Sequence, residues 1–309
     1  MDVACIGLMV CDIIIGPVDK TVFDVDSTRL GALTVASGGD ALNTAINLAK
    51  LGLKVGMVGK VGNDIFGGYL IGQANHHGVD TYAVKKAERC ATATSIVMVD
   101  QTGERHFAYY GEANDNLQLH DVDFDRIKDA KIVHLGSAMA LQGLDGPGVA
   151  ELFKRIKASG AVTSMDVTWD SAGKWLEKIE DALFYTDIFM PSYNEARIIS
   201  GKETPQEMEE FFKPYGIKIL VIKLGAQGCF VTDFITGRRI NTYQNVKAID
   251  TTGAGDAFVA GFLTGITKKW DIFQCGLFGN AVASNCVMAV GATTGIKSMG
   301  HILKFMEEH

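Results

Sequence analysis

Hydrophobic and polar positions follow two different periods along this chain, and the change of period separates the expected elements. Short, continuous apolar runs predict buried strands at 3–7, 54–59, 132–135, 162–166, 188–190 and 219–223. Between them, apolar residues recur at helical spacing and predict helices at 40–51, 67–77, 148–158, 194–200, 255–267 and 272–290. Apolar strands that alternate with helices indicate a mostly parallel sheet covered on both faces, which is an α/β fold.

One region breaks this alternation. Residues 93–99 and 105–110 are β-rich, and the Gly-containing turn 100–104 joins them without a helix. With strand-like runs at 12–16 and 32–37, the hairpin predicts a small sheet, from about 12–37 and 91–112, inserted in a single domain of residues 1–309. A protruding sheet favours a lid that excludes water from a reaction. A passive dimerisation sheet is the alternative, and the two roles are compatible.

Composition narrows the class of protein. The 309 residues are 47% hydrophobic and 21% charged, which is typical of an ordinary globular enzyme. The net charge is −7 and no run of Lys and Arg occurs, so neither nucleic acid nor an anionic membrane is expected as a partner. Six scattered cysteines indicate reduced thiols, and we find neither a signal peptide nor an apolar stretch of about 18 residues. These features predict a cytoplasmic protein.

The most specific segment runs from Asp250 to Phe258 and reads Asp-Thr-Thr-Gly-Ala-Gly-Asp-Ala-Phe. Its small residues let a ligand approach the backbone, and Gly255 and Asp256 open an apolar helix whose free amides suit a phosphate. A carboxylate there would repel a passively bound phosphate, but it makes sense as the base that takes a proton from an attacking hydroxyl. A tight turn with an ordinary N-terminal charge is the simpler alternative.

A second glycine-rich segment begins at Gly38. Gly38 and Gly39 let a polyol approach the backbone, and Asn43, one helical turn later, offers both a donor and an acceptor to hydroxyl groups. The segment 59–67 resembles a dinucleotide-binding turn only weakly, because Gly-x-Gly-x-x-Gly is absent. The phosphate-binding loop Gly-x-x-x-x-Gly-Lys-Ser/Thr is absent too, which argues against a P-loop kinase.

Both segments, in this order, resemble the two signatures of the ribokinase-like (PfkB) carbohydrate kinases, and the resemblance extends over the whole chain. It implies a three-layer α/β/α fold with a β-sheet lid that also mediates a homodimer. It further implies an enzyme that uses ATP and Mg²⁺ to phosphorylate a primary hydroxyl of a monosaccharide or a sugar derivative.

The resemblance also implies roles for individual residues. Gly253, Ala254 and Gly255 correspond to an anion hole, and Asp256 to the catalytic base. The expected substrate-binding residues are Asp12, Gly38, Gly39, Asn43 and, by a looser match, Asn114. The expected nucleotide-binding residues are Lys223, Gly225, Gly228 and Asn280, with a place on the helix surface as the alternative for Asn280.

Two positions depart from the family pattern. Glu195 stands at the place expected near the phosphates and Mg²⁺, but Ser192 replaces the usual Asn three residues earlier. Relatives of this type often bind K⁺ beside the anion hole, and the matching residues here are Asp250, Thr252, Cys286, Ala289, Gly291 and Gly295. Gly295 stands where a hydroxyl residue is common, so potassium activation is left open.

The sugar itself is not determined by these motifs. The segment 111–114 favours the ribokinase pattern, whereas 38–43 and 103–107 resemble 2-keto-3-deoxygluconate kinases. Those kinases place an Arg shortly after the second lid strand, where this chain has Tyr109, Tyr110 and Gly111 and no Arg follows until Arg126. Arg105 and Lys174 are the residues that could replace it, by position only. A sugar-acid kinase, a nucleoside kinase of the same family and a non-catalytic sugar-binding regulator therefore remain as alternatives.

Overall fold

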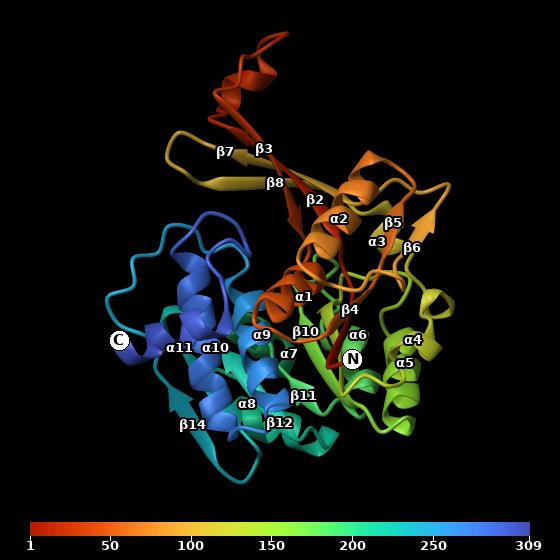
Figure 1. Ribbon diagram of the computed structural model, residues 1–309, viewed down its shortest axis with the longest axis vertical. Helices are drawn as coiled ribbons and strands as arrows, with labels where there is room; N and C mark the ends of the chain where they lie inside the picture. The colour runs from red at the N-terminus through yellow and green to blue at the C-terminus, as the bar shows by residue number, and fades with distance from the viewer.

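A central sheet of eight strands forms the middle layer of the molecule (Figure 1). The computed structural model describes residues 1–309. The strand order is β14 (Gly237–Ile240), β13 (Cys229–Thr232), β12 (Ile219–Lys223), β11 (Ile188–Phe189), β10 (Val162–Val167), β9 (Ile132–Ala138), β1 (Val3–Ile6) and β4 (Val55–Val58). Strands β12 to β4 in this order are parallel, as the apolar runs predicted, and the antiparallel pair β13–β14 extends one edge.

Helices cover both faces of this sheet because alternate strand residues point to opposite sides. In β1, Val3 and Cys5 belong to one buried cluster, and Ala4 and Ile6 belong to the other. The first cluster includes α1 (Asp40–Lys50), α2 (Ile65–His76), α9 (Ala254–Thr267), α10 (Ile272–Val287) and α11 (Met299–Glu308). The second includes α4 (Phe124–Ile127), α5 (Pro147–Ala158), α6 (Leu176–Leu183), α7 (Tyr193–Ser200) and α8 (Pro205–Phe212). No helix is both long and apolar enough to cross a bilayer.

The predicted second sheet is present and projects from one end of the molecule (Figure 1). Its order is β3 (Ala32–Gly38), β2 (Val10–Gly16), β7 (Thr94–Val99) and β8 (Arg105–Tyr110), and we call it the lid sheet. Strands β2 and β7 are parallel, and the two outer pairs are antiparallel. The short helix α3 (Glu112–Asp115) follows β8, and a small pair, β5 (Lys60–Gly62) and β6 (Lys85–Ala87), lies near α2.

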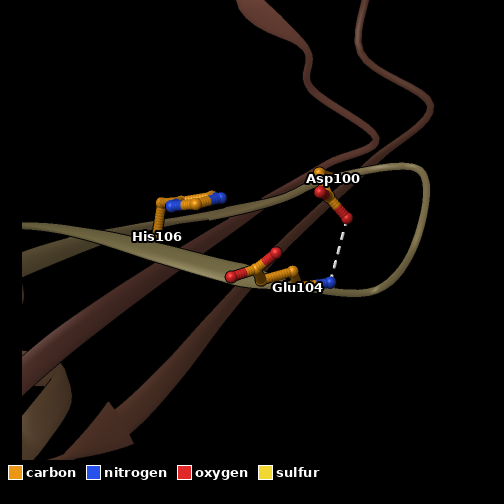
Figure 2. Close-up of side chains that lie close together, drawn as sticks. All are labelled: Asp100, Glu104 and His106. Carbon is orange, nitrogen blue, oxygen red and sulfur yellow. Dashed lines mark hydrogen bonds between the residues drawn. The ribbon is translucent and has the colours of Figure 1, made fainter.

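The turn between β7 and β8 is closed by a carboxylate. Asp100 Oδ1 accepts a hydrogen bond of 2.8 Å from the backbone amide of Thr102. It accepts a second, of 2.9 Å, from the backbone amide of Glu104, which Figure 2 shows. The ligand atoms of Asp100, Glu104 and His106 lie within 4.8 Å of one another. The Asp100 carboxylate already accepts hydrogen bonds from amides of the turn. The turn therefore explains why the side chains of Asp100, Glu104 and His106 lie close together.

Helices α9 and α10 pack at unusually close range through glycines. A Cβ atom on Gly261 would lie 2.8 Å from Gly279 Cα, and one on Gly265 would lie 2.6 Å from Cys275 Sγ. Helix α10 ends at Val287 rather than at the predicted 290, and the following chain turns at Gly291, whose φ is 94°. This turn brings the chain after α10 next to the loop before α9.

Candidate active site

Two helices that are distant in the sequence place polar side chains against each other. Asp256 lies in the first turn of α9 and Asn43 in the first turns of α1. Asn43 Nδ2 donates a hydrogen bond of 2.9 Å to Asp256 Oδ2, and both side chains are buried. Asn43 Oδ1 has no hydrogen-bond partner within the protein. A buried acceptor ordinarily has a donor, so Asn43 Oδ1 is an unpartnered polar atom in the side chain that bonds to the carboxylate.

The start of α9 is shaped by Gly253. Its φ is 73°, which favours glycine, and a Cβ atom there would lie 2.3 Å from Ala292 Cβ. The helix begins at the next residue, so its first amides lack partners within the helix and, with the helix dipole, suit an anion. The residues expected to form the anion hole therefore stand immediately before and beside Asp256.

Asp256 has the character of a strengthened base. Burial raises its pKa well above the usual value, and the nearby carboxylate of Asp40 raises the pKa further, whereas the hydrogen bond from Asn43 lowers it. Asp40 is the first residue of α1 and accepts a 2.8 Å hydrogen bond from Ser137 Oγ. Asp40 was not among the predicted site residues, although its spacing of three from Asn43 places both on one helix face.

The predicted substrate residues of β2 and β3 lie together beside the start of α1. Gly38 contacts Asp12 so closely that a Cβ atom on Gly38 would lie 2.1 Å from Asp12 Oδ2. Gly39 has a φ of 93°, and a Cβ atom there would lie 2.5 Å from the carbonyl oxygen of Leu8. Burial raises the pKa of Asp12 to about 6, although the charge of Arg105 lowers it. Asp12 is thus a carboxyl group held close to glycine backbone.

Asn114 differs from its expected role. Its Nδ2 donates to the carbonyl oxygen of Met9, at 3.1 Å, and to Tyr109 Oη, at 3.2 Å. Its Oδ1 accepts from the Met9 amide at 3.3 Å, and the residue is fully buried. All of these groups already have partners, so Asn114 positions Tyr109 and lacks the free amide that a direct contact with sugar requires.

A large cavity opens between the end of β8 and the loop that follows β10. Its volume is about 970 Å³, and Tyr109, Tyr110 and Trp169 give it aromatic walls. Two lysines also line it. Lys178 is paired with Asp170 at 2.9 Å, whereas Lys174 is exposed at the rim. The cavity therefore combines aromatic walls with one paired and one exposed lysine.

A second cavity, of about 410 Å³, lies at the N-terminus of α9. It is lined by every predicted nucleotide-binding glycine and by two anion-hole residues, among others: Lys223, Gly225, Gly228, Ala254, Gly255 and Asn280. Asn280 is 3% exposed, and its Nδ2 donates to the carbonyl oxygens of Ile240 and Asn241, both at 3.2 Å. Asn280 is therefore a cavity residue and not the helix-surface residue that we weighed as its alternative.

A buried lysine stands among carboxylates at the ends of two strands. Lys223, at the end of β12, contacts Asp166, near the end of β10. Burial alone would lower the pKa of Lys223, but the charges of Asp166 and Glu195 outweigh it and raise the pKa, so the lysine stays protonated. The sequence analysis missed Asp166, whose signal was an acid at the carboxyl end of a predicted parallel strand.

Ser192 serves as the cap of α7. Its Oγ accepts from the Glu195 amide at 3.4 Å, and Glu195 Oε2 accepts from the Ser192 amide at 2.7 Å. This reciprocal pair is a capping box. The replacement of Asn by Ser at this position therefore keeps Glu195 fixed beside Lys223.

The residues matched to a potassium site lie in two adjoining segments, the loop before α9 and the chain from the end of α10: Asp250, Thr252, Cys286, Ala289, Gly291 and Gly295. Asp250 Oδ2 accepts bonds of 2.8 Å from both Arg105 Nη2 and the Gly291 amide. Cys286 Sγ donates to the carbonyl oxygen of Thr252 at 3.5 Å. Because the Asp250 carboxylate and the Thr252 carbonyl oxygen have partners and a guanidinium balances the charge of Asp250, these two residues do not fit a potassium ion.

Comparisons with known proteins agree with the geometry. A sugar kinase of Archaeoglobus fulgidus, itself uncharacterized, is 34% identical over 81% of this chain and 98% of its own length. A 5-dehydro-2-deoxygluconokinase of Clostridium perfringens is 30% identical over 88% of this chain and 84% of its own. A candidate ribokinase II from E. coli, solved with ATP and Mg²⁺, superimposes with a TM-score of 0.87 at 25% identity and covers 100% of this chain and 99% of its own.

The family match extends over nearly the whole sequence. Residues 1–299 match the pfkB family carbohydrate kinase. The ribokinase-like fold expected from the two signatures is confirmed by the structural comparison and by the mostly parallel sheet with its lid. The chain therefore belongs to the pfkB family of carbohydrate kinases, and it is an enzyme of that class.

Proposed function

We propose that this kinase transfers the γ-phosphate of ATP to a primary hydroxyl of a neutral sugar, with Asp256 as the base. The contact between Asn43 and Asp256 carries the proposal, because it leaves one unpartnered acceptor and one strengthened base at the same point. The substrate hydroxyl donates its proton to Asp256 as its oxygen attacks phosphorus, and ADP leaves. The amides at the start of α9 stabilise the charge on the transferred group.

ATP is assigned to the 410 Å³ cavity, with Lys223 and Asn280 on its walls. The similar E. coli protein was solved with ATP and Mg²⁺, which supports ATP as the phosphoryl donor of this fold. Mg²⁺, when bound with ATP, balances the charge of the phosphate oxygens. Glu195 and Asp166 fit it, because carboxylates are hard oxygen donors that hold Mg²⁺ directly or through water.

A neutral sugar is favoured over a sugar acid by the state of the nearby cations. Arg105, which sequence position suggested as a carboxylate ligand, is paired with Asp250. Lys178 is paired with Asp170, and Gly111 follows Tyr110 where sugar-acid kinases place an arginine. Lys174, the other lysine on this cavity wall, is exposed, and its Nζ lies 3.8 Å from Glu177 Oε1. Because some of the similar proteins are 5-dehydro-2-deoxygluconokinases, a sugar acid is the alternative substrate that would replace this proposal.

A nucleoside is the second candidate substrate, and one observation favours it. The large cavity has about 970 Å³ and three aromatic walls, more than a monosaccharide fills. Aromatic rings stack well on a planar base. A nucleoside kinase from Methanocaldococcus jannaschii shares the fold, with a TM-score of 0.82 at 22% identity.

We further propose a cytoplasmic homodimer in which the lid sheets of two copies pack against each other. All six cysteines are free, in keeping with a reducing compartment. The face of the lid sheet that bears Leu33, Val35 and Ile96 is apolar and exposed. An exposed apolar sheet face of this kind marks an interaction site.

The proposal is tested by ADP release in the presence of pentoses, ketohexoses, sugar acids, inositols and nucleosides, each with ATP and Mg²⁺. We expect the highest kcat/KM for a neutral sugar. A sugar acid or a nucleoside as the best substrate would replace the substrate assignment while leaving phosphoryl transfer in place.

The role of Asp256 is tested in the same assay. Asp256→Asn should fold and bind the sugar but lose a factor of about 10² or more in kcat, because the hydroxyl proton has no acceptor. Asp181→Asn, an exposed change on α6, is the matched control and should leave kcat unchanged. Near wild-type turnover of the Asp256→Asn variant would show that another group is the base.

A further inference from the structure

One side chain joins the lid sheet to the loop that opens α9. Arg105, the first residue of β8, donates through Nη2 to Asp250 Oδ2 at 2.8 Å and through Nη1 to Thr252 Oγ1. In Figure 1 the β7–β8 hairpin extends over the C-terminal part of the chain. The motifs did not predict this connection, because it joins positions that are 145 and 147 residues apart.

Asp250 is built to receive this guanidinium. Its side chain is 5% exposed and also accepts bonds from the amides of Gly291, at 2.8 Å, and Thr252, at 3.0 Å. Burial raises the pKa of Asp250, but these hydrogen bonds and the charge of Arg105 outweigh burial and hold the pKa below its usual value. The carboxylate is therefore ionised, and Arg105 supplies its counter-charge from the lid.

The loop that receives Arg105 leads directly into the anion hole. Thr252 precedes Gly253, whose left-handed backbone aims the first amides of α9. Within the lid sheet, Ser95 of β7 lies opposite Tyr109 of β8 and also opposite Asp12 of β2, the neighbouring strand on its other edge. Side chains at Arg105, Tyr109 and Asp12 therefore share one face, since residues two or four apart on a strand point the same way.

We propose that Arg105 is a latch, a positioning residue that fixes the anion-hole loop when the lid sheet closes over the sugar. This proposal rests on the proposed function, because the latch makes phosphoryl transfer depend on a closed lid. Because the guanidinium occupies the carboxylate expected to bind potassium, the same contact makes the enzyme independent of that ion. A salt bridge with a purely structural role would change stability without changing the fate of the phosphoryl group.

The first test compares Arg105→Gln with His106→Gln, a neighbour that points to the opposite face of β8. For each variant, kcat for the sugar, KM for ATP and the rate of ATP hydrolysis without sugar are measured. Arg105→Gln should lower kcat by about 10², because a misplaced anion hole costs this much, while KM for ATP changes by less than about threefold. The ratio of hydrolysis to transfer should rise at least about tenfold.

Arg105→Lys is the conservative variant. A lysine keeps the charge on Asp250 but cannot reach Thr252 with a second, fixed donor, so kcat should fall between wild type and Arg105→Gln. Asp250→Asn should lose as much as Arg105→Gln, and the double variant should lose little more, because both changes open the same latch. Additive losses, or kcat and a hydrolysis ratio within twofold of wild type, would overturn the proposal.

The second test adds KCl or guanidinium chloride to wild type and to Arg105→Gln. Wild-type kcat should not depend on potassium. The variant should not be rescued by either cation, because the latch requires a charge that is tethered to the lid. Full restoration of kcat by either ion would show that neutralising Asp250 is sufficient and would overturn the latch.

A third measurement does not require the sugar to be known. In Arg105→Gln, backbone amides of 94–110 and of 251–256 should exchange hydrogen at least about tenfold faster than in wild type, and those in His106→Gln should not. Unchanged exchange in both segments contradicts the latch even if the enzyme is a sugar kinase. If no sugar is phosphorylated by the wild type, the proposed function fails, and the exchange result still decides about the latch.

Discussion

At the scale of the residue, one lysine stands among several buried acids. Burial and the charges of neighbouring carboxylates raise the pKa of Asp40, Asp166 and Asp256, while the charge of Lys223 lowers it. The balance keeps Asp256 a stronger proton acceptor than an exposed aspartate. Because neighbouring carboxylates shift the pKa of Asp256, replacing one of these neighbours should change the pH dependence of the reaction.

Asp40→Asn tests this coupling. The amide keeps an acceptor for Ser137 Oγ but removes a negative charge near Asp256, so the pKa of Asp256 falls. The acid limb of kcat/KM against pH should therefore move to lower pH. Asp181→Asn should leave the limb in place. A limb that stays fixed or moves to higher pH in Asp40→Asn would rule out the coupling.

Asp12 makes a prediction about stability. Burial raises its pKa from 3.8 to about 6, so the folded state holds the proton more tightly than the unfolded state. The cost of ionising Asp12 is absent below pH 3.8 and complete above pH 6. Asp12→Asn should therefore raise the free energy of unfolding by about 3 kcal/mol at pH 8 and by almost nothing at pH 3.5. Urea unfolding at the two pH values measures the difference, and an equal effect at both would contradict the assignment.

Residues of the site differ in how far sequence could predict them. Asp256, Gly253 and Asn43 stand in dense local motifs, so their positions followed from short segments. Asp166 and Arg105 depend on partners more than fifty residues away, and only the folded sheet brings them together. Asn114 shows the converse, because a local match to a motif did not reveal that its amide was already satisfied.

At the scale of the element, periodicity predicted the parallel strands and the long helices. It missed the edge strand β14, whose residues Gly-Arg-Arg-Ile are mostly exposed and carry no apolar run. It also missed α6 and α8. The capping box formed by Thr204 and Glu207 was a readable signal for α8, whereas α6 follows Trp175, whose φ of 45° no local pattern indicates.

At the scale of the whole molecule, the lid sheet has two unlike faces. One face carries Asp12 and Arg105 toward the site. On the other, Ile13 pairs in register with Val35 and Ile96, which form an apolar surface with Leu33. This second face is where we expect a second copy of the chain to bind.

Ile96→Lys should therefore shift the protein from dimer to monomer, because a charge on each copy would be buried at the interface. Ile235→Lys is the matched control, since Ile235 is 90% exposed in the distant β13–β14 turn. Light scattering over a range of protein concentrations measures the mass of both variants. A monomeric wild type, or a dimer that survives in Ile96→Lys, would contradict the interface.

The glycine contacts between α9 and α10 bear on how this enzyme can diverge. Side chains at 261, 265 or 279 would collide, so the two helices that carry the base, the anion hole and Asn280 form a block that tolerates few substitutions. The walls of the large cavity come instead from a strand end and from separate loops. New substrates can therefore be acquired, in nature or by directed evolution, through changes near 109–112 and 168–174 while the machinery for ATP is inherited unaltered.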